Sequence, residues 1–384
     1  MRRVTFLVGL PFCLLASCVP SAYPALTRPY PAVNAEQIPL PGGDKLSPAG
    51  TQIPLPGRPR HLLVSPSGKL VVVLTEGTAF LHLLRGTSQA VLDQQRLPAP
   101  GTAMAFGPDE ETLYVAGGKQ NQIYCFRIQE DNKLLADSAL LLGGAQLKIT
   151  VAGLAIDSRR HRLYAVTRDD QALYTFDLRT RRLLGRVSLG SAASAVAITA
   201  DGQTLYIAQG GSATVSVYQV AQQKLIATIR VGTHPTDIVL SRDGQRLAVA
   251  NAGSNSVSLI DTRRQQVVET LPASPPSSST QPADSTVSSV AFSANEQQLF
   301  IANAARNCLA VYDMAQLGAS HLVGFVPTGW QPSAVRSLGN SLLVANEKGS
   351  PALFSTQAGS LSVLPLPDQA TLTRYSAQVK ANSR

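Results

Sequence analysis

The sequence predicts an all-β fold, a seven-bladed β-propeller with four antiparallel strands in each blade. A segment recurs seven times at intervals of 42 to 52 residues, apolar and polar residues alternate within each copy, and Gly, Asn and Asp separate the alternating runs. The chain has 384 residues, of which 44% are hydrophobic and 15% charged. This composition is sufficient for the large core that such a repeat array requires.

The beginning of the chain, MRRVTFLVGLPFCLLASC, predicts export. Its apolar run follows two arginines and is too short to span a bilayer, which is typical of a signal peptide over residues 1–17. The run ends in LASC, which resembles the bacterial lipobox, so Cys18 is the expected lipidation site, with a plain secreted protein as the alternative. The valine after Cys18 favours the outer membrane, facing the periplasm, over the inner membrane. Residues 18–48, which include a stretch rich in Pro and Ala, are expected to form a tether.

The blades themselves are expected over residues 49–368. In the clearest copy, residues 232–271, three alternating runs separated by turn residues precede a fourth run. The second run of every copy aligns without gaps, beginning at Leu70, Leu113, Leu163, Leu205, Leu247, Leu299 and Leu342. One four-stranded blade cannot bury both faces of its sheet, whereas seven blades stacked around an axis can.

The two ends of the repeat region predict how the ring closes. The last copy ends after its third run, SLSVLPLP, and Gln52–Pro56 has the layout of a fourth strand with no blade before it. We therefore expect Gln52–Pro56 to complete the last blade, where prolines are tolerated because an outermost strand has one unpaired edge. The earlier copy of the same motif, Gln37–Gly42, is expected to lie in the tether.

Several repeats carry a resemblance to a known family. LYVAGG, LAVANAGSNSVSLID and GTHPTDIVLS are similar to the YVTN repeats of bacterial extracytoplasmic propellers. LSPAGTQIPLPG, GWQPSAV and GSLSVLPLPDQATLTRYSAQVKAN resemble the propeller half of bifunctional YVTN β-propeller/alkaline-phosphatase-like proteins, a likeness that covers about residues 46–381. In those relatives a metal-dependent phosphoesterase domain follows the propeller. This sequence ends at Arg384 and contains no phosphoesterase motif, so that activity is not expected from it.

The tail, residues 369–384, is expected to form a short helix laid on the ring, because Leu372, Tyr375 and Val379 follow helical spacing. No metal and no cofactor are expected, since no two of the five histidines are spaced to bind one metal and no phosphate-cradling loop is present. Cys125 and Cys308 lie four blades apart in the predicted ring, too far for a disulfide, so both are expected to be free structural thiols.

A ligand is expected at the mouth of the central channel, where the loops between blades and the loops between second and third strands share one face. Exposed Trp and Arg favour recognition, and the only tryptophan of the chain lies in one of these loops, although it could instead pack against a neighbouring blade. The candidate ligand-binding residues are Arg60, His61, His234, Asp237, Trp330, Arg168 and Arg306, with Glu347 and Lys348 nearby.

The opposite face has a basic rim in blade three, formed by the turns SRRHR and RTRR. Its six arginines are Arg159, Arg160, Arg162, Arg179, Arg181 and Arg182. Such clustering could hold anionic lipid headgroups or nucleic-acid phosphates, and the alternative is a row of solvated turns. The low aromatic content, 5%, argues against a base-stacking platform, so nucleic acid is not expected as a partner.

The sequence thus predicts a monomeric, non-catalytic, extracytoplasmic propeller that binds an envelope protein or a small ligand at the channel mouth. Two alternatives stay open. One is a hydrolase resembling propeller lactonases, for which His234, His61 and Arg60 are the candidate base and cation. The other is a subunit of an envelope complex whose partner is a separate phosphoesterase.

Overall fold

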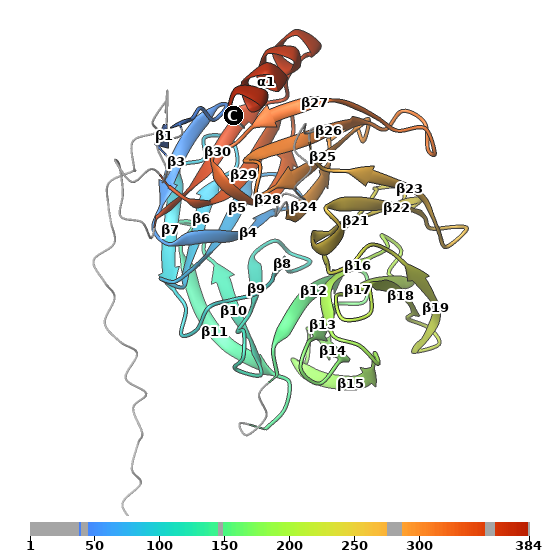
Figure 1. Cartoon of the computed structure of the whole chain (residues 1–384). Helices are drawn as coiled ribbons and strands as arrows, with labels where there is room; N and C mark the ends of the chain where they lie inside the picture. The colour runs from blue at the N-terminus through green and yellow to red at the C-terminus, as the bar shows by residue number, and fades with distance from the viewer. Residues whose placement is uncertain (1–37, 40–44, 145–148, 275–285, 350–357, 383–384) are drawn as a thin grey trace, which may run out of the picture.

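A computed structural model describes residues 38–39, 45–144, 149–274, 286–349 and 358–382. The predicted signal peptide, Cys18 and most of the predicted tether lie outside the described residues. Within them, seven four-stranded antiparallel sheets form a ring, and the first strand of each sheet lies nearest the axis (Figure 1). The predicted seven-bladed propeller is therefore confirmed.

The first four blades follow one another along the chain. Blade one consists of β4 (Arg58–Val64), β5 (Leu70–Glu76), β6 (Phe80–Arg85) and β7 (Val91–Arg96). Blade two consists of β8 (Met104–Phe106), β9 (Thr112–Ala116), β10 (Gln122–Ile128) and β11 (Leu134–Leu141). Blade three consists of β12 (Val151–Asp157), β13 (Arg162–Thr167), β14 (Ala172–Asp177) and β15 (Arg182–Ser188). Blade four consists of β16 (Ala193–Ile198), β17 (Thr204–Gln209), β18 (Thr214–Gln219) and β19 (Lys224–Arg230).

The remaining three blades complete the ring. Blade five consists of β20 (Pro235–Leu240), β21 (Arg246–Asn251), β22 (Ser256–Asp261) and β23 (Gln266–Pro272), with a 3-10 turn, η1 (Ala252–Ser254), between β21 and β22. Blade six consists of β24 (Val287–Phe292), β25 (Gln298–Asn303), β26 (Cys308–Asp313) and β27 (His321–Pro327). Blade seven consists of β28 (Trp330–Leu338), β29 (Ser341–Lys348), β30 (Gly359–Pro365) and the N-terminal strand β3 (Thr51–Leu55).

Strand β3 closes the ring as predicted, one residue earlier than the sequence suggested. It pairs antiparallel with β30, with Ile53 opposite Leu361. The buried Gln52 side chain fixes this register, since its Oε1 accepts hydrogen bonds from Ser360 Oγ at 3.2 Å and Ser362 Oγ at 2.8 Å. The turn before β3 requires glycine, because Gly50 has a φ of +71° and a Cβ there would lie 2.3 Å from the Val363 carbonyl oxygen.

Residues just before β3 also contact the ring. The short strands β1 (Ile38–Pro39) and β2 (Lys45–Leu46) pair with each other, and the side chain of Leu46 is buried. The Ala49 amide donates to the Pro327 carbonyl at 2.9 Å, which attaches this segment to blade six. The copy QIPLPG at Gln37–Gly42 thus contributes to a small hairpin, although most of it lies outside the described residues.

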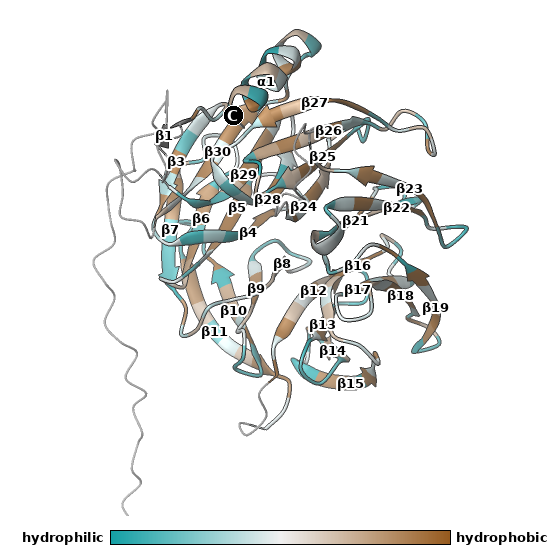
Figure 2. Ribbon diagram, viewed as in Figure 1, coloured by the Kyte–Doolittle hydropathy of each residue, from teal (hydrophilic) through white to brown (hydrophobic). Residues whose placement is uncertain are grey.

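The core consists of apolar clusters between neighbouring blades. Because side chains alternate between the two faces of a strand, Leu299 and Ile301 pack on blade five whereas Phe300 packs on blade seven. All three are fully buried. Figure 2 shows this distribution as hydrophobic residues along the strands and hydrophilic residues in many of the turns. Period-two alternation in the middle strands therefore joins seven separate sheets into one ring.

Hydroxyl groups on the innermost strands link successive blades near the axis. Each of these strands except β8 has a register shift near its beginning, where a residue is left out of the strand pairing. At this position Ser194 Oγ donates to the Pro235 carbonyl at 2.6 Å, Ser288 Oγ to the Pro332 carbonyl at 2.6 Å, and Ser333 Oγ to the Pro59 carbonyl at 2.7 Å. In blade one the corresponding residue is Arg60.

The C-terminal helix α1 (Gln369–Asn382) lies against β27 of blade six (Figure 1). Leu372 and Val379, which the sequence placed on its apolar face, are buried. Close approach requires Gly324, where a Cβ would lie 2.7 Å from Leu372 Cγ. The Phe325 amide donates to Ser376 Oγ at 2.9 Å. No helix in the described part of the chain combines the length and the apolar character needed to span a bilayer.

The two cysteines within the fold are free and buried, as predicted. Cys125 lies in β10, and Cys308 is the first residue of β26. Burial raises the pKa of Cys125 to about 11 and the pKa of Cys308 to about 12, so neither thiol is ionised at neutral pH. Both therefore act as small apolar side chains.

Candidate functional site

A charged cluster spans the innermost strands of three neighbouring blades. Asp237 on β20 forms an ion pair with Arg336 on β28, with 3.3 Å between Oδ2 and Nη1. Between them lies Ser289 on β24, whose Oγ donates to Asp237 Oδ2 at 2.6 Å. Arg336 Nη1 also donates to Ser289 Oγ at 3.1 Å and to its neighbour's carbonyl, Val335 O, at 2.7 Å. We call Asp237, Ser289 and Arg336 the axial cluster.

His61 on β4 lies within electrostatic range of the axial cluster. Removal from solvent lowers the pKa of His61 to about 4, although the carboxylates of Asp237 and Glu76 act in the opposite direction. The imidazole is therefore neutral at neutral pH and can accept a proton or a hydrogen bond. The structure thus places His61 near both Asp237 and Arg336, and the sequence analysis did not single out Arg336.

Arg60 takes part in a second set of ion pairs at the seam between blades one and seven. Its Nε lies 3.0 Å from Glu76 Oε2, and its Nη1 lies 2.6 Å from Glu347 Oε1. Arg58 adds a longer contact of 3.6 Å to Glu76. Burial raises the pKa of Glu347, and the positive charge of Arg60 opposes that shift. Arg60 thus takes the position of the blade-linking hydroxyl in blade one, but it forms a charged bridge to blade seven rather than a bond to blade two.

Trp330 lies in blade seven, opposite Lys348 in the pairing of β28 with β29. The Lys348 Nζ lies 4.6 Å from the centroid of the indole ring, which is a cation–π contact. Trp330 is partly exposed and belongs to none of the apolar clusters found among the described residues. We call Arg60, Trp330, Glu347 and Lys348 the seam site.

The other three predicted ligand-binding residues belong to neither the axial cluster nor the seam site. His234 is exposed immediately before β20 and has a φ of +50°. Arg168 is exposed after β13. Arg306 lies between β25 and β26, and its buried Nε has no hydrogen-bond partner among the described residues. Among the described residues, no hydrogen bond or ion pair joins any of the three to Arg60 or His61.

The expectation that Arg60, His61, Asp237 and Trp330 occupy connecting loops is wrong, because all four lie within innermost strands. These strands pair past the proline near their beginning by leaving one residue out of the ladder, so they start earlier than alternation alone suggested. Sequence analysis also missed Ser289 and Arg336. Arg336 could have been noticed as the single charged residue in the run SAVRSL, which the repeat predicts to be an innermost strand.

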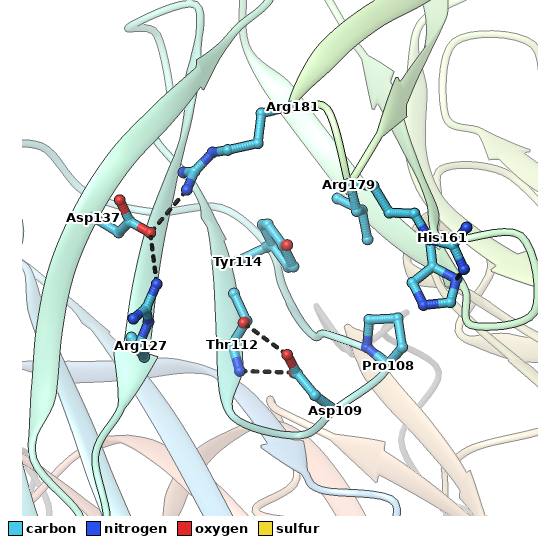
Figure 3. Close-up of a pocket in the computed structure, with 10 residues that line it drawn as sticks. Pro108, Asp109, Thr112, Tyr114, Arg127, Asp137, His161, Arg179 and Arg181 are labelled. Atoms are coloured by element: carbon cyan, nitrogen blue, oxygen red, sulfur yellow. Dashed lines mark hydrogen bonds and ion pairs between the residues drawn. The ribbon is translucent and has the colours of Figure 1, made fainter.

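The basic rim of blade three borders a pocket of about 350 Å³ between blades two and three (Figure 3). Arg179 and Arg181 of the predicted set line it, together with Pro108, Asp109, Thr112, Tyr114, Arg127, Asp137, His161 and Leu178. Arg160 is turned away, with its Nη1 2.9 Å from Asp157 Oδ2. Arg159, Arg162 and Arg182 do not line the pocket. In the described part of the chain, no three His, Cys, Asp or Glu side chains are grouped to hold a metal ion.

Comparisons with known proteins agree with this architecture. No curated protein matches the sequence. A solved structure of U3-55K has a TM-score of 0.66 at 15% identity, covering 81% of this chain and 96% of that one. The hydrazine synthase of Kuenenia stuttgartiensis has a TM-score of 0.65 at 19% identity, covering 81% of this chain and 96% of that one. The WD40 repeats of RRP9 give 0.66 at 15% identity, with 81% and 95% covered.

At these identities the structural likeness shows the fold alone, a repeat propeller of WD40-like construction. The model of one family, by contrast, matches residues 49–341, which include all seven innermost strands. The matched region begins just before the closing strand and ends within blade seven, so it covers most of the ring. This chain therefore belongs to the YNCE-like beta-propeller family.

Proposed function

We propose that this chain is an exported lipoprotein whose propeller binds a protein partner of the cell envelope through the seam site. A rigid ring with side chains displayed at one end suits binding. The observation that carries the proposal is that the only tryptophan of the chain lies partly exposed at the beginning of an innermost strand, covered by Lys348 rather than by the core.

The neighbouring charges support the same proposal. Adjacent residues of a strand point to opposite faces, so Glu347 reaches Arg60 in blade one while Lys348 covers Trp330 within blade seven. Both side chains of each pair are thereby held in place before a partner arrives, which lowers the entropy cost of association. Trp and Arg are the residues that dominate binding energy at protein interfaces.

Replacing Trp330 by Ala should weaken partner binding by roughly 30-fold or more, because a central tryptophan commonly contributes about 2 kcal/mol or more at an interface. The measurement is quantitative mass spectrometry of proteins crosslinked to the full chain in membranes, compared between wild type and variant. Leu322→Ala serves as the control, since Leu322 is exposed on the outer strand of blade six. A partner captured equally by wild type and Trp330→Ala would contradict the seam site.

Replacing Cys18 by Ala should release the protein from the membrane fraction and abolish incorporation of labelled palmitate. The reason is that the predicted lipobox places the acylated residue at Cys18, and stable anchoring needs its acyl chains. Fractionation and labelling of expressing cells measure both effects. Cys125→Ala is the matched control, because that thiol is buried in blade two. Unchanged labelling of Cys18→Ala would show that another residue carries the lipid and would contradict this part of the proposal.

A further inference from the structure

The outer edges of blades two and three combine the basic pocket with exposed leucines, and the seam site uses none of these residues. We call this the blade 2–3 surface, and its members are Arg127, Leu135, Arg179, Arg181, Arg182, Leu183 and Leu184. Strands β11 and β15 approach each other here. Across this approach, Arg181 Nη1 of blade three donates to Asp137 Oδ2 of blade two at 2.8 Å.

The leucines are unusually exposed for a folded chain. Of the seven large hydrophobic side chains that are strongly exposed among the described residues, four lie on these two outer strands. Leu135 is 53% exposed, Leu183 42% and Leu184 52%, and Leu141 at the far end of β11 is 61% exposed. Apolar side chains gathered on an outer surface indicate a contact with something else.

One arginine of the pocket, Arg181, is placed at some conformational cost. Arg181 has a φ of +59°, a left-handed conformation that favours Asn and Gly. The corresponding turns of four other blades place Gln or Asn there, at Gln89, Asn132, Gln223 and Gln265. Only blade three among these five uses the position for an arginine, which both closes the seam with Asp137 and lines the pocket.

The pocket is net positive even after its internal ion pairs (Figure 3). Arg127 and Arg181 share one carboxylate, Asp137, at 3.8 Å and 2.8 Å. The Arg179 side chain forms one hydrogen bond among the described residues, between its Nη2 and His161 Nδ1 at 3.3 Å, and pairs with neither carboxylate of the pocket. The second carboxylate, Asp109, accepts hydrogen bonds from the Glu111 and Thr112 amides instead of pairing with an arginine. Three guanidinium groups thus face two carboxylates, which suits an anionic group.

We propose that the blade 2–3 surface docks on a bilayer containing anionic phospholipid. One headgroup phosphate occupies the pocket, and Leu135, Leu183 and Leu184 enter the boundary between headgroups and acyl chains. The strand register supports this arrangement, since Leu135 lies directly opposite Arg127 and Leu183 follows Arg182. Cations beside protruding apolar side chains are typical of proteins that lie on anionic membranes. The docking would orient the ring whether or not Cys18 carries lipid.

The test uses the full chain with Cys18→Ser, so that no lipid anchor contributes. Sedimentation with vesicles of phosphatidylcholine, with and without phosphatidylglycerol, should show binding only when phosphatidylglycerol is present, and high salt should weaken it. Arg179→Ser with Arg182→Ser should weaken binding by roughly 30-fold, because each basic residue near an anionic surface contributes about a factor of 5 to 6. Leu183→Ser with Leu184→Ser should weaken it by roughly 10-fold or more.

Two matched controls decide whether the surface is specific. Arg263→Ser with Arg264→Ser changes the corresponding turn of blade five, and Leu141→Ser changes the exposed leucine farthest from the pocket on β11. Both should bind within about twofold of the parent chain. An equal loss in the blade-five variant would attribute binding to the overall charge of the chain, +9, and overturn the proposal. Circular dichroism of every variant confirms that the ring is folded.

A phosphate site without membrane docking gives a different pattern. In that case inorganic phosphate would bind the chain in calorimetry, Arg179→Ser would abolish that binding, and the leucine variant would retain full vesicle binding. This outcome would also overturn the proposal. Neither failure affects the seam site, because Trp330 and Arg60 lie outside the blade 2–3 surface.

Discussion

Replacing Leu55 by Asp should prevent the ring from closing and leave the chain largely unfolded. The Leu55 side chain is 1% exposed and packs with Leu62 and Val73 of blade one and Leu361 of blade seven. The substitution loses about 2 to 3 kcal/mol of apolar burial and adds the cost of a buried carboxylate, several kcal/mol more. Together these costs approach the whole stability of a typical domain, about 5 to 15 kcal/mol.

Circular dichroism, gel filtration and urea unfolding followed by Trp330 fluorescence measure the effect. Ile226→Asp makes the same kind of change on β19, the outermost strand of blade four, where Ile226 is 43% exposed, and should lower the free energy of unfolding by less than about 1 kcal/mol. Equal unfolding midpoints for the two variants would show that β3 contributes little to the ring. The comparison separates closure of the ring from the general effect of a new charge.

Acidification from pH 7 to pH 4 should destabilise the protein, and His82 should account for about 3 kcal/mol of the loss. His82 is 1% exposed in β6, and burial lowers its pKa to about 4, against a hydrogen bond to the Pro56 carbonyl that acts in the opposite direction. At pH values between 6.5, the ordinary pKa of histidine, and about 4, His82 binds a proton in the unfolded chain but not in the folded chain. Stability from this group is therefore complete above pH 6.5 and falls as the pH drops towards 4.

The free energy of unfolding in urea at several pH values tests this expectation. His82→Gln should flatten the dependence between pH 6.5 and 4 relative to wild type, because glutamine does not titrate. His321→Gln is the control for the substitution itself, since the His321 side chain is 67% exposed on the outer strand of blade six. A wild-type slope retained in His82→Gln would assign the acid sensitivity to other groups, among them His61, whose pKa is also lowered to about 4.

His82 illustrates how one blade departs from its repeats. At the corresponding position of the third strand, three other blades carry Ser216, Ser258 and Ser362, each of which forms a hydrogen bond with a polar side chain of its own blade. In blade one, by contrast, His82 Nε2 has no hydrogen-bond partner among the described residues. The same blade replaces the linking hydroxyl near the axis with Arg60. Blade one, which meets the closing blade, therefore departs from the repeat pattern at two polar positions.

Much of this architecture follows from local pattern alone. Seven second strands align without gaps, and turn residues mark their ends, so blade number and strand order could be predicted from the sequence. The closing strand could also be identified, because the last repeat lacks a fourth run and the first segment lacks a blade. Free cysteines followed in the same way from their separation by four blades.

The candidate sites depended on information that no local pattern contains. Alternation cannot show that β20, β24 and β28 start early through a bulge, so Asp237, Ser289 and Arg336 could not be placed together. The pocket at the blade 2–3 surface likewise brings together residues of two different blades that are distant in the sequence, such as Arg127 and Arg181.

The sequence by itself determined the number of blades, the strand order and the closure, because each follows from the period of apolar residues and from short turns. Only the tertiary structure decided which side chains meet, as in Arg60 with Glu347 and Arg181 with Asp137. The physical reason is that stacking brings together residues from different repeats, and the twist and bulges of each sheet, rather than the repeat itself, fix their final distance.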